Sequence, residues 1–180
     1  SDMVDTSRVE IGDAIVGLPA NGLHTNGYSL ARRVLPPQRF GDRLNGETIG
    51  DALLAVHPCY LPSIDALREA GVTIKAMAHI TGGGLIENVP RVLPDHAAAR
   101  FDRSTWTVPA IEALIVREAG LAGDEPYRVL NMGVGFCIIV RREDARRAVD
   151  AVAHGQPPLA ASIVGDIEPR HSCGPAVIIS

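Results

Sequence analysis

The chain has 180 residues, which is enough for one domain with a sizeable core, and it is 46% hydrophobic and 21% charged, as is typical of a soluble globular protein. A net charge of −4 and an aromatic content of 4% argue against the basic surface and the stacking platforms that bind nucleic acid. No apolar run approaches the ~20 residues of a membrane span, and the first residues show no signal peptide. We therefore expect no nucleic-acid partner and no membrane partner.

The three cysteines Cys59, Cys137 and Cys173 are far apart in the sequence and form no Cys-x-x-Cys pair. This spacing argues against a disulfide framework or a zinc site, and reduced thiols indicate a cytoplasmic location. Cys137 lies within an apolar run, which indicates a packing residue. The chain does not begin with methionine, which suggests a piece of a longer chain.

Apolar periodicity predicts strands and helices that alternate along the chain. Proline or glycine marks the end of several of them; Pro36 follows the first helix and Gly120 the longest one. Strands are expected over residues 13–18, 72–80, 97–101, 134–140, 159–167 and 176–179. Helices are expected over residues 28–35, 48–56, 61–70, 85–93, 105–119 and 143–154. Most connections are short, so the pattern predicts one layered α/β or α+β domain over residues 1–180.

The stretch Ala78-His-Ile-Thr-Gly-Gly-Gly84 carries the clearest candidate site. Three consecutive glycines would each destabilise a regular element by roughly 0.5–1 kcal/mol, so the backbone is expected to take positive φ angles or to approach a ligand. A strand, then glycines, then the start of a helix directs backbone N–H groups toward an anion. The alternative is a tight turn in which glycine only provides room. The loop is neither a Walker A loop nor a dinucleotide fingerprint.

His24 and His79 each lie beside a glycine-containing turn. Histidine transfers protons near neutral pH and donates hydrogen bonds to phosphates, so both are candidate site residues. The alternative for each is a structural histidine held by hydrogen bonds. The other histidines have no such setting; they are His57, His96, His154 and His171, of which His96 and His154 are expected at the surface.

Three further features are candidates for ligand contact. The sequence Thr25-Asn26-Gly27 offers a hydroxyl, an amide and a flexible backbone, or simply an Asn-Gly turn. Asn131 begins the segment Asn131-Met-Gly-Val-Gly135, whose glycines could admit a ligand or mark a bulge. Glu87 could position a substrate, or it could be a first-turn acid favoured by the helix dipole. Paired carboxylates with the spacing of metal ligands are absent from the sequence.

Three segments together resemble the aminoimidazole ribonucleotide synthetase family, also called phosphoribosylformylglycinamidine cyclo-ligases. They are Gly22-Leu-His-Thr-Asn-Gly-Tyr-Ser29, residues 78–84 with Glu87-Asn-Val-Pro-Arg-Val-Leu-Pro94, and Tyr127-Arg-Val-Leu-Asn-Met-Gly-Val-Gly135. The resemblance runs nearly end to end but covers only the family's C-terminal domain. The N-terminal motifs Asp-Gly-Val-Gly-Thr-Lys and Gly-Gly-Glu-Thr-Ala-Glu-Met-Pro-Gly are missing from this chain.

The resemblance implies a mixed β-sheet flanked by helices, forming the C-terminal half of a two-domain enzyme of purine biosynthesis. It implies ATP-dependent closure of formylglycinamidine ribonucleotide to aminoimidazole ribonucleotide, with ATP phosphorylating the formamide oxygen. The implied cofactors are ATP and Mg²⁺, with the metal ligands mainly in the missing N-terminal half. The full-length protein is expected to be a homodimer, and this piece alone is expected to be inactive.

The matching motifs also assign roles to particular residues. His24 and His79 are the implied catalytic residues, and this chain supplies no metal ligand. The implied substrate- or phosphate-binding residues are Thr25, Asn26, Gly27, Thr81, Gly82, Gly83, Gly84, Glu87 and Asn131.

Departures from the family pattern leave two alternatives open. Val56-His57-Pro58-Cys59 stands where the family usually has Ala-Pro-Thr, and Thr25 stands where it has serine. Such changes are compatible with a divergent relative of the selenophosphate synthetase, thiamine-monophosphate kinase or hydrogenase maturation factor type. The other alternative is a non-catalytic module that binds a phosphate or a nucleotide.

Overall fold

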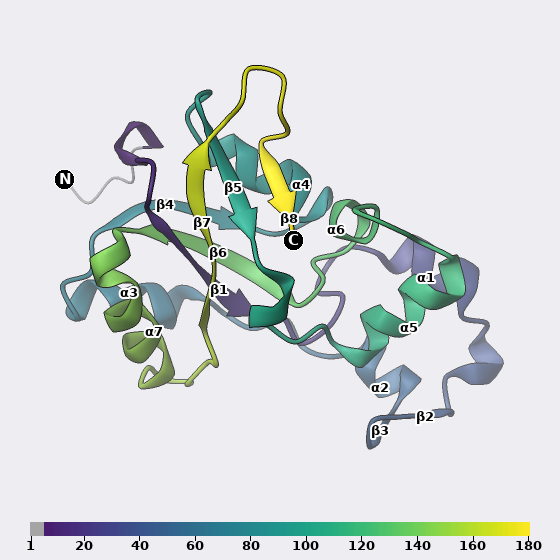
Figure 1. Ribbon diagram of the computed structural model, residues 1–180. Helices are drawn as coiled ribbons and strands as arrows, with labels where there is room; N and C mark the ends of the chain where they lie inside the picture. Colours follow the sequence, from purple (N-terminus) through teal and green to yellow (C-terminus); the bar gives the residue numbers. More distant parts are fainter. Residues whose placement is uncertain (1–5) are drawn as a thin grey trace.

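The computed structural model describes residues 6–180 and is built around a six-stranded mixed sheet (Figure 1). The start of the chain, where no signal peptide is expected, lies outside the described residues. The strand order is β4-β6-β1-β7-β5-β8; neighbouring strands are antiparallel except β5 and β8, which are parallel. The strands are β1 (Ala14–Pro19), β4 (Ile74–His79), β5 (Ala97–Phe101), β6 (Val134–Val140), β7 (Ser162–Pro169) and β8 (Val177–Ile179). A mixed sheet flanked by helices confirms the expected fold class.

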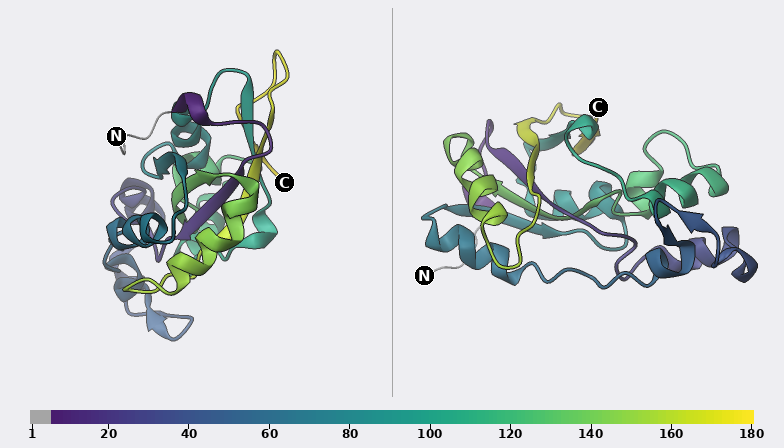
Figure 2. Two further views of the ribbon diagram at one scale, coloured as in Figure 1. Left: turned by 90° about the vertical axis from the view of Figure 1, so that its left-hand side faces the viewer. Right: turned by 90° about the horizontal axis from the view of Figure 1, so that it is seen from below.

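Helices cover the sheet and form a lobe at one end of it. They are α1 (Tyr28–Val34), α2 (Ile49–Leu53), α3 (Leu61–Glu69), α4 (Gly84–Asn88), α5 (Ala110–Ala119), α6 (Pro126–Val129) and α7 (Ala145–Ala153). Helices α3 and α7 pack against each other at one end, whereas α1, α2 and α5 lie together at the opposite end (Figure 2). A hairpin of β2 (Arg43–Leu44) and β3 (Glu47–Thr48) joins the lobe beside α2.

The central strand β1 separates two hydrophobic cores. Its side chains alternate between the two faces of the sheet, as the pleat of a strand requires. Ala14, Val16 and Leu18 pack in the core beneath α3 and α7, whereas Ile15 packs in the larger core on the other face. All of them are buried, which explains why this segment reads as a continuous apolar run.

The structure differs from the expected elements at several boundaries. The second helix spans only Ile49–Leu53, and the helix expected from residue 105 begins at Ala110, after Pro109. The hairpin and α6 were not expected. Asn45 and Gly46 form the hairpin turn with φ angles of 49° and 98°, and Asn-Gly with two positive φ angles is a standard hairpin signal that the sequence contained.

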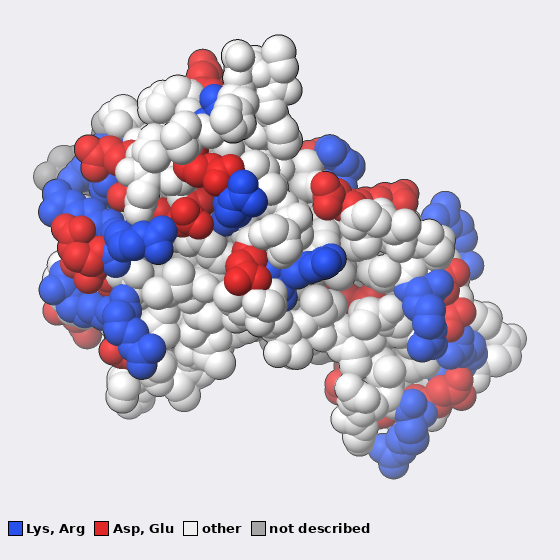
Figure 3. All heavy atoms as spheres, in the orientation of Figure 1, with Lys and Arg blue, Asp and Glu red and all other residues white. Residues whose placement is uncertain are grey.

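The described part of the chain has no helix that is both long enough and apolar enough to cross a membrane. On the face shown in Figure 3, acidic and basic side chains are mixed at both ends of the molecule and also lie in its middle, among uncharged areas.

Candidate functional site

His24 lies in the loop between β1 and α1 and points inward. Its backbone has a positive φ of 57°, which is uncommon for a residue other than glycine. The His24 side chain is buried, whereas the neighbouring Thr25 is exposed. A buried polar side chain on a loop with an uncommon backbone conformation is typical of a functional site.

Rings from four segments of the chain, including that of His24, form one cluster. The His24 and His57 rings stack with centroids 3.9 Å apart and an interplanar angle of 15°. The ring of His57 also lies 5.2 Å from that of His79 at the end of β4. Tyr60 and Phe136 complete the cluster. His57 lies beside no glycine turn in the sequence, but the fold brings it between the two candidate histidines. We call these five residues the ring cluster.

Gly135 makes room for the ring cluster. A Cβ atom at this position would overlap the Tyr60 hydroxyl and would lie 2.7 Å from Cε1 of His24. The Tyr60 hydroxyl donates a hydrogen bond of 2.9 Å to the carbonyl oxygen of Pro19. We expected another group to come close to the glycines after Asn131. At Gly135 this is the case, and the groups that come close are the side chains of Tyr60 and His24.

The environment of His24 favours its neutral form. Burial, reinforced by the charges of His57 and His79, lowers the pKa of His24 to about 4. Burial and His57 also lower the pKa of the more exposed His79. Neither ring nitrogen of His24 has a hydrogen-bond partner among the described residues. A buried polar group without a partner costs about 1–3 kcal/mol, so a ligand that supplied the missing hydrogen bonds would bind favourably.

The glycine loop of Thr81, Gly82, Gly83 and Gly84 follows His79 directly. Gly83 and Gly84 take the expected positive φ angles of 99° and 57°. The side-chain amide of Asn88 donates to the carbonyl oxygens of Thr81, Gly82 and Gly84 at 3.3, 3.2 and 2.8 Å. Because one buried amide engages three carbonyls, the loop has a defined shape.

Both candidate loops rest on the same segment, residues 127–131. A Cβ atom at Gly84 would overlap the carbonyl oxygen of Tyr127, and one at Gly27 would lie 2.6 Å from Cδ2 of Leu130. The amide of Asn26 donates a 3.4 Å hydrogen bond to the carbonyl oxygen of Val129, while its Oδ1 atom is buried without a partner in the described part of the chain. The three sequence segments that carry the family resemblance therefore meet in space.

Asn131 and Glu87 have partners within the protein. Asn131 is buried; its amide donates to the carbonyl oxygen of Gly22 at 2.8 Å, and its Oδ1 atom accepts from the N–H of Gly133 at 2.9 Å. Glu87 is exposed and forms a 3.0 Å ion pair with Arg128, also exposed. In this structure Asn131 thus holds the loop before His24, and Glu87 lies at the rim of the glycine loop.

Glu112 is a buried titratable residue that sequence reasoning missed. It lies on α5 and is completely buried, and within residues 6–180 neither carboxylate oxygen has a partner with hydrogen-bond geometry. Burial raises the pKa of Glu112 to about 8, although the backbone of Met132 and the amide of Asn131 lie near enough to oppose the shift. The signal available in the sequence was an acidic residue that directly follows Ile111, among the apolar residues of an amphipathic helix.

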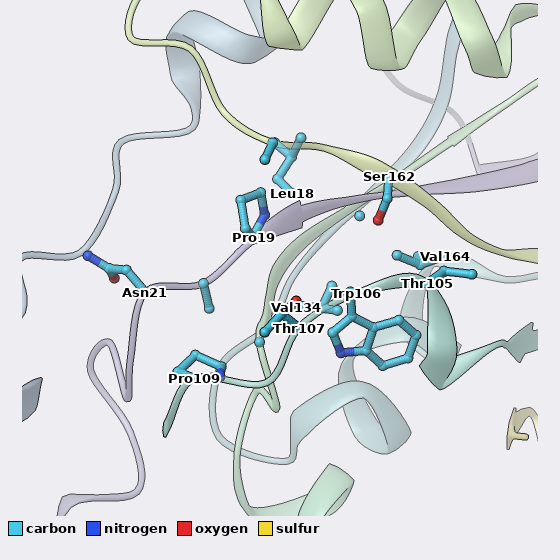
Figure 4. Close-up of a pocket in the computed structure, with 14 residues that line it drawn as sticks. Leu18, Pro19, Asn21, Thr105, Trp106, Thr107, Pro109, Val134, Ser162 and Val164 are labelled. Carbon is cyan, nitrogen blue, oxygen red and sulfur yellow. The ribbon is translucent and has the colours of Figure 1, made fainter. Parts of the chain in front are cut away.

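A hollow of about 420 Å³ lies on another part of the domain, beside β1 and β7 (Figure 4). In Figure 4 the ring of Trp106 lies below the side chain of Ser162, and Asn21 lies farther to the left. The residues around it are Gly17, Leu18, Pro19, Ala20, Asn21, Thr105, Trp106, Thr107, Pro109, Gly133, Val134, Ala160, Ser162 and Val164. No residue predicted to catalyse or to bind substrate lines this hollow.

The donor atoms near the ring cluster fit a phosphate-bearing ligand better than a metal ion. Among residues 6–180, no group of three or more His, Cys, Asp or Glu side chains is arranged to hold a metal. The unpartnered nitrogens of His24 and the shaped glycine loop offer hydrogen-bonding groups of the kind that phosphates and amides use.

Comparisons with known proteins show the family of this chain. Residues 10–177 match the model of the AIR synthase related protein, C-terminal domain. A phosphoribosylformylglycinamidine cyclo-ligase of Anaeromyxobacter sp. (strain Fw109-5) is 46% identical over 173 residues, which are 93% of this chain and 49% of the relative. One of Thermoanaerobacter sp. (strain X514) is 41% identical over 159 residues, 83% of this chain and 45% of the relative.

The chain thus spans about half the length of the curated relatives that it matches. The crystal structure of E. coli HypE, a hydrogenase maturation protein, is similar in fold, with a TM-score of 0.63 and 20% identity over 98% of this chain and 49% of that one. The likeness to HypE concerns the fold alone, whereas the family model covers nearly all of the sequence. This chain therefore belongs to the AIR synthase related protein family, of which residues 10–177 form a C-terminal domain.

Proposed function

We propose that this chain is the C-terminal half of an ATP-dependent cyclo-ligase that converts formylglycinamidine ribonucleotide to aminoimidazole ribonucleotide. The observation that carries the proposal is the buried, unpartnered imidazole of His24 beside His79 and the glycine loop. The names of relatives at 41–46% identity give the reaction. The N-terminal half of the enzyme would supply most of the nucleotide site and the Mg²⁺ ligands.

In this proposal the chain's residues bind and orient the reacting groups. ATP, when bound, supplies the phosphoryl group that makes the formamide oxygen a good leaving group. The glycine loop binds a phosphate through its backbone, either that of the nucleotide or the 5′-phosphate of the ribose. Neutral His24 donates one hydrogen bond and accepts another, which holds the polar formamide and amidine groups in place. His79 is more exposed and takes up the proton that the ring-closing nitrogen releases.

The same proposal extends to the assembly and its location. We expect the full-length protein to act in the cytoplasm as a homodimer formed largely through its N-terminal half. The chain alone is expected to be inactive, because half of the site lies outside it.

A cyclisation assay on the full-length protein tests the proposal. His79→Ala and Gly83→Val should each lower turnover at least about 100-fold, since one removes a proton acceptor and the other disturbs the loop backbone. His96→Ala is the matched control, because His96 is exposed and outside the ring cluster. Unchanged turnover in both site variants would contradict the assignment of the site.

A second candidate is a non-catalytic domain that binds phosphate through the same loop. It is favoured by the defined shape of the glycine loop, which the Asn88 amide of this chain holds through three carbonyl oxygens. Adding inorganic phosphate to the 180-residue chain should raise its melting temperature if the loop binds phosphate by itself. Cyclisation by the full-length protein would separate the two candidates.

A further inference from the structure

His57 is held in place by a segment that is fastened on both sides of it. Residues 54–60, which we call the strap, connect α2 to α3 and run along the molecule from the helical lobe toward the sheet (Figure 2, right). The side-chain amide of Asn21 donates a hydrogen bond of 2.8 Å to the carbonyl oxygen of Val56. The Tyr60 hydroxyl donates one of 2.9 Å to the carbonyl oxygen of Pro19. Both hydrogen bonds join the strap to the end of β1 and the loop that carries His24.

The orientation of His24 depends on ring packing. Its two nitrogens have no hydrogen-bond partner among the described residues, so no polar contact fixes the plane of the ring. His57 stacks on this ring nearly in parallel, and the Cα of Gly135 leaves room for its edge. If the ring of His57 were removed, His24 would lose the stacking contact that restrains its ring orientation when no ligand is bound.

We propose that His57 is a positioning residue of this site: stacked on His24 and anchored by the strap, it fixes the direction in which the His24 nitrogens meet the substrate. The inference rests on the proposed function for its catalytic consequence. The effect of His57 on His24 itself belongs to this chain and can be measured without catalysis.

The stacking of His57 on His24 should have a measurable effect on the pKa of His24. The titratable groups that face the two rings are Tyr60 from the strap and His79 from β4. Burial raises the pKa of Tyr60, so its hydroxyl is uncharged at neutral pH. His57 lowers the pKa of His24 in two ways, because its ring excludes water and its positive charge repels an imidazolium.

NMR titration of the histidine ring protons in the 180-residue chain tests this effect. His57→Phe keeps a flat ring on His24 but removes the charge, so the midpoint of His24 should rise part of the way toward its ordinary value. His57→Ala removes both effects, so the midpoint should rise further. His96→Ala should leave it unchanged. A midpoint in His57→Ala equal to that of the unmodified chain, or equal midpoints in the Ala and Phe variants, would overturn the proposal.

The catalytic consequence is measured in the full-length protein. His57→Ala should lower kcat at least about tenfold with little change in KM, since misplacing a group at the reacting centre affects the transition state most. His57→Phe should restore most of kcat. Loss of rescue by phenylalanine would overturn the positioning role. If the unmodified full-length protein has no cyclisation activity, the proposed function fails, while the NMR titration still decides whether His57 positions His24.

Discussion

The side-chain amide of Asn131 donates a 2.8 Å hydrogen bond to the carbonyl oxygen of Gly22, joining segments 109 residues apart in the sequence. The other end of the same amide accepts from the N–H of Gly133. A single buried side chain therefore holds the start of the His24 loop against the turn that leads into β6. This bridge, together with residues 127–130, sets where His24 lies relative to the glycine loop.

Replacing Asn131 should loosen this bridge. Asn131→Ala removes two hydrogen bonds and leaves two buried backbone groups unpaired, so the free energy of unfolding should fall by about 2–4 kcal/mol. Urea denaturation measures the change. Asn21→Ala is the matched control, because Asn21 is exposed and its single hydrogen bond to Val56 should contribute no more than about 1 kcal/mol. Equal losses in the two variants would contradict the role given to Asn131.

Two glycines of the same loop should respond differently to alanine. At Gly84 the φ angle is positive and a Cβ atom would overlap the carbonyl oxygen of Tyr127, so Gly84→Ala should destabilise the fold by about 3 kcal/mol or more. At Gly82 a Cβ atom meets nothing within 4 Å, so Gly82→Ala should change the stability by less than about 0.5 kcal/mol. Thermal unfolding of both variants compares them.

Gly82→Ala also separates binding from folding. Its methyl group would project into open space beside the loop, where the proposed phosphate lies. We expect the variant to keep its fold and to lose turnover in the full-length protein. A variant with full stability and full turnover would argue against phosphate contact at this position.

Glu112 predicts a pH dependence of stability. Its pKa is about 8 in the folded chain and near 4.5 when unfolded, so the folded state holds the proton more tightly. The resulting stabilisation is complete below pH 4.5 and is lost as the pH rises through 8, a change on the order of 5 kcal/mol. Glu112→Gln mimics the protonated form and should remove this loss.

The comparison is made by urea denaturation between pH 5 and 9. The Glu112→Gln variant should match the unmodified chain at the low end and exceed its stability at the high end. Glu143→Gln, at an exposed position, should follow the unmodified chain throughout. If the Glu112→Gln variant had the same pH profile as the unmodified chain, Glu112 would titrate normally and the prediction would be wrong.

The buried ion pair between Lys75 of β4 and Asp13, which directly precedes β1, predicts a large effect of a single substitution. Lys75 and Asp13 are each 5% exposed in their side chains, with Nζ 2.7 Å from Oδ1. Lys75→Met leaves the Asp13 carboxylate buried without its cation, so stability should fall by about 3–5 kcal/mol. The control is Arg100→Met, whose side chain is 43% exposed and pairs with Glu168; it should lose no more than about 1 kcal/mol. Similar losses, measured by urea denaturation, would contradict the difference in burial.

Much of the sheet could be predicted from the sequence because its central strands are buried on both faces. Strands β5 and β6 occupy the expected residues, and β1 is displaced by only one residue. The start of α5 was placed too early, since the apolar pattern extends across Pro109 while the helix begins after it. The local pattern thus identified the strands of the large sheet and most helices but missed the short hairpin and α6. Pro109 decided one boundary that the apolar pattern alone misplaced.

The site could be predicted only in part, because its geometry comes from contacts between distant segments. His24 and His79 each lie beside a glycine turn, and the glycine loop is itself a run of three glycines. These features can be recognised in the sequence. His57 has no such local mark, and its proposed role rests on the strap that packs it on His24. Glu112 was hidden on the apolar side of a helix, where only the folded structure shows that its carboxylate lacks a partner.

The most direct test of the central claim is to titrate the full-length protein with formylglycinamidine ribonucleotide while recording the histidine ring protons by NMR. We predict that the signals of His24, His57 and His79 shift together as the ligand fills the site, while the exposed His96 does not respond. Binding that shifts none of the three clustered histidines would contradict the account and place the substrate elsewhere.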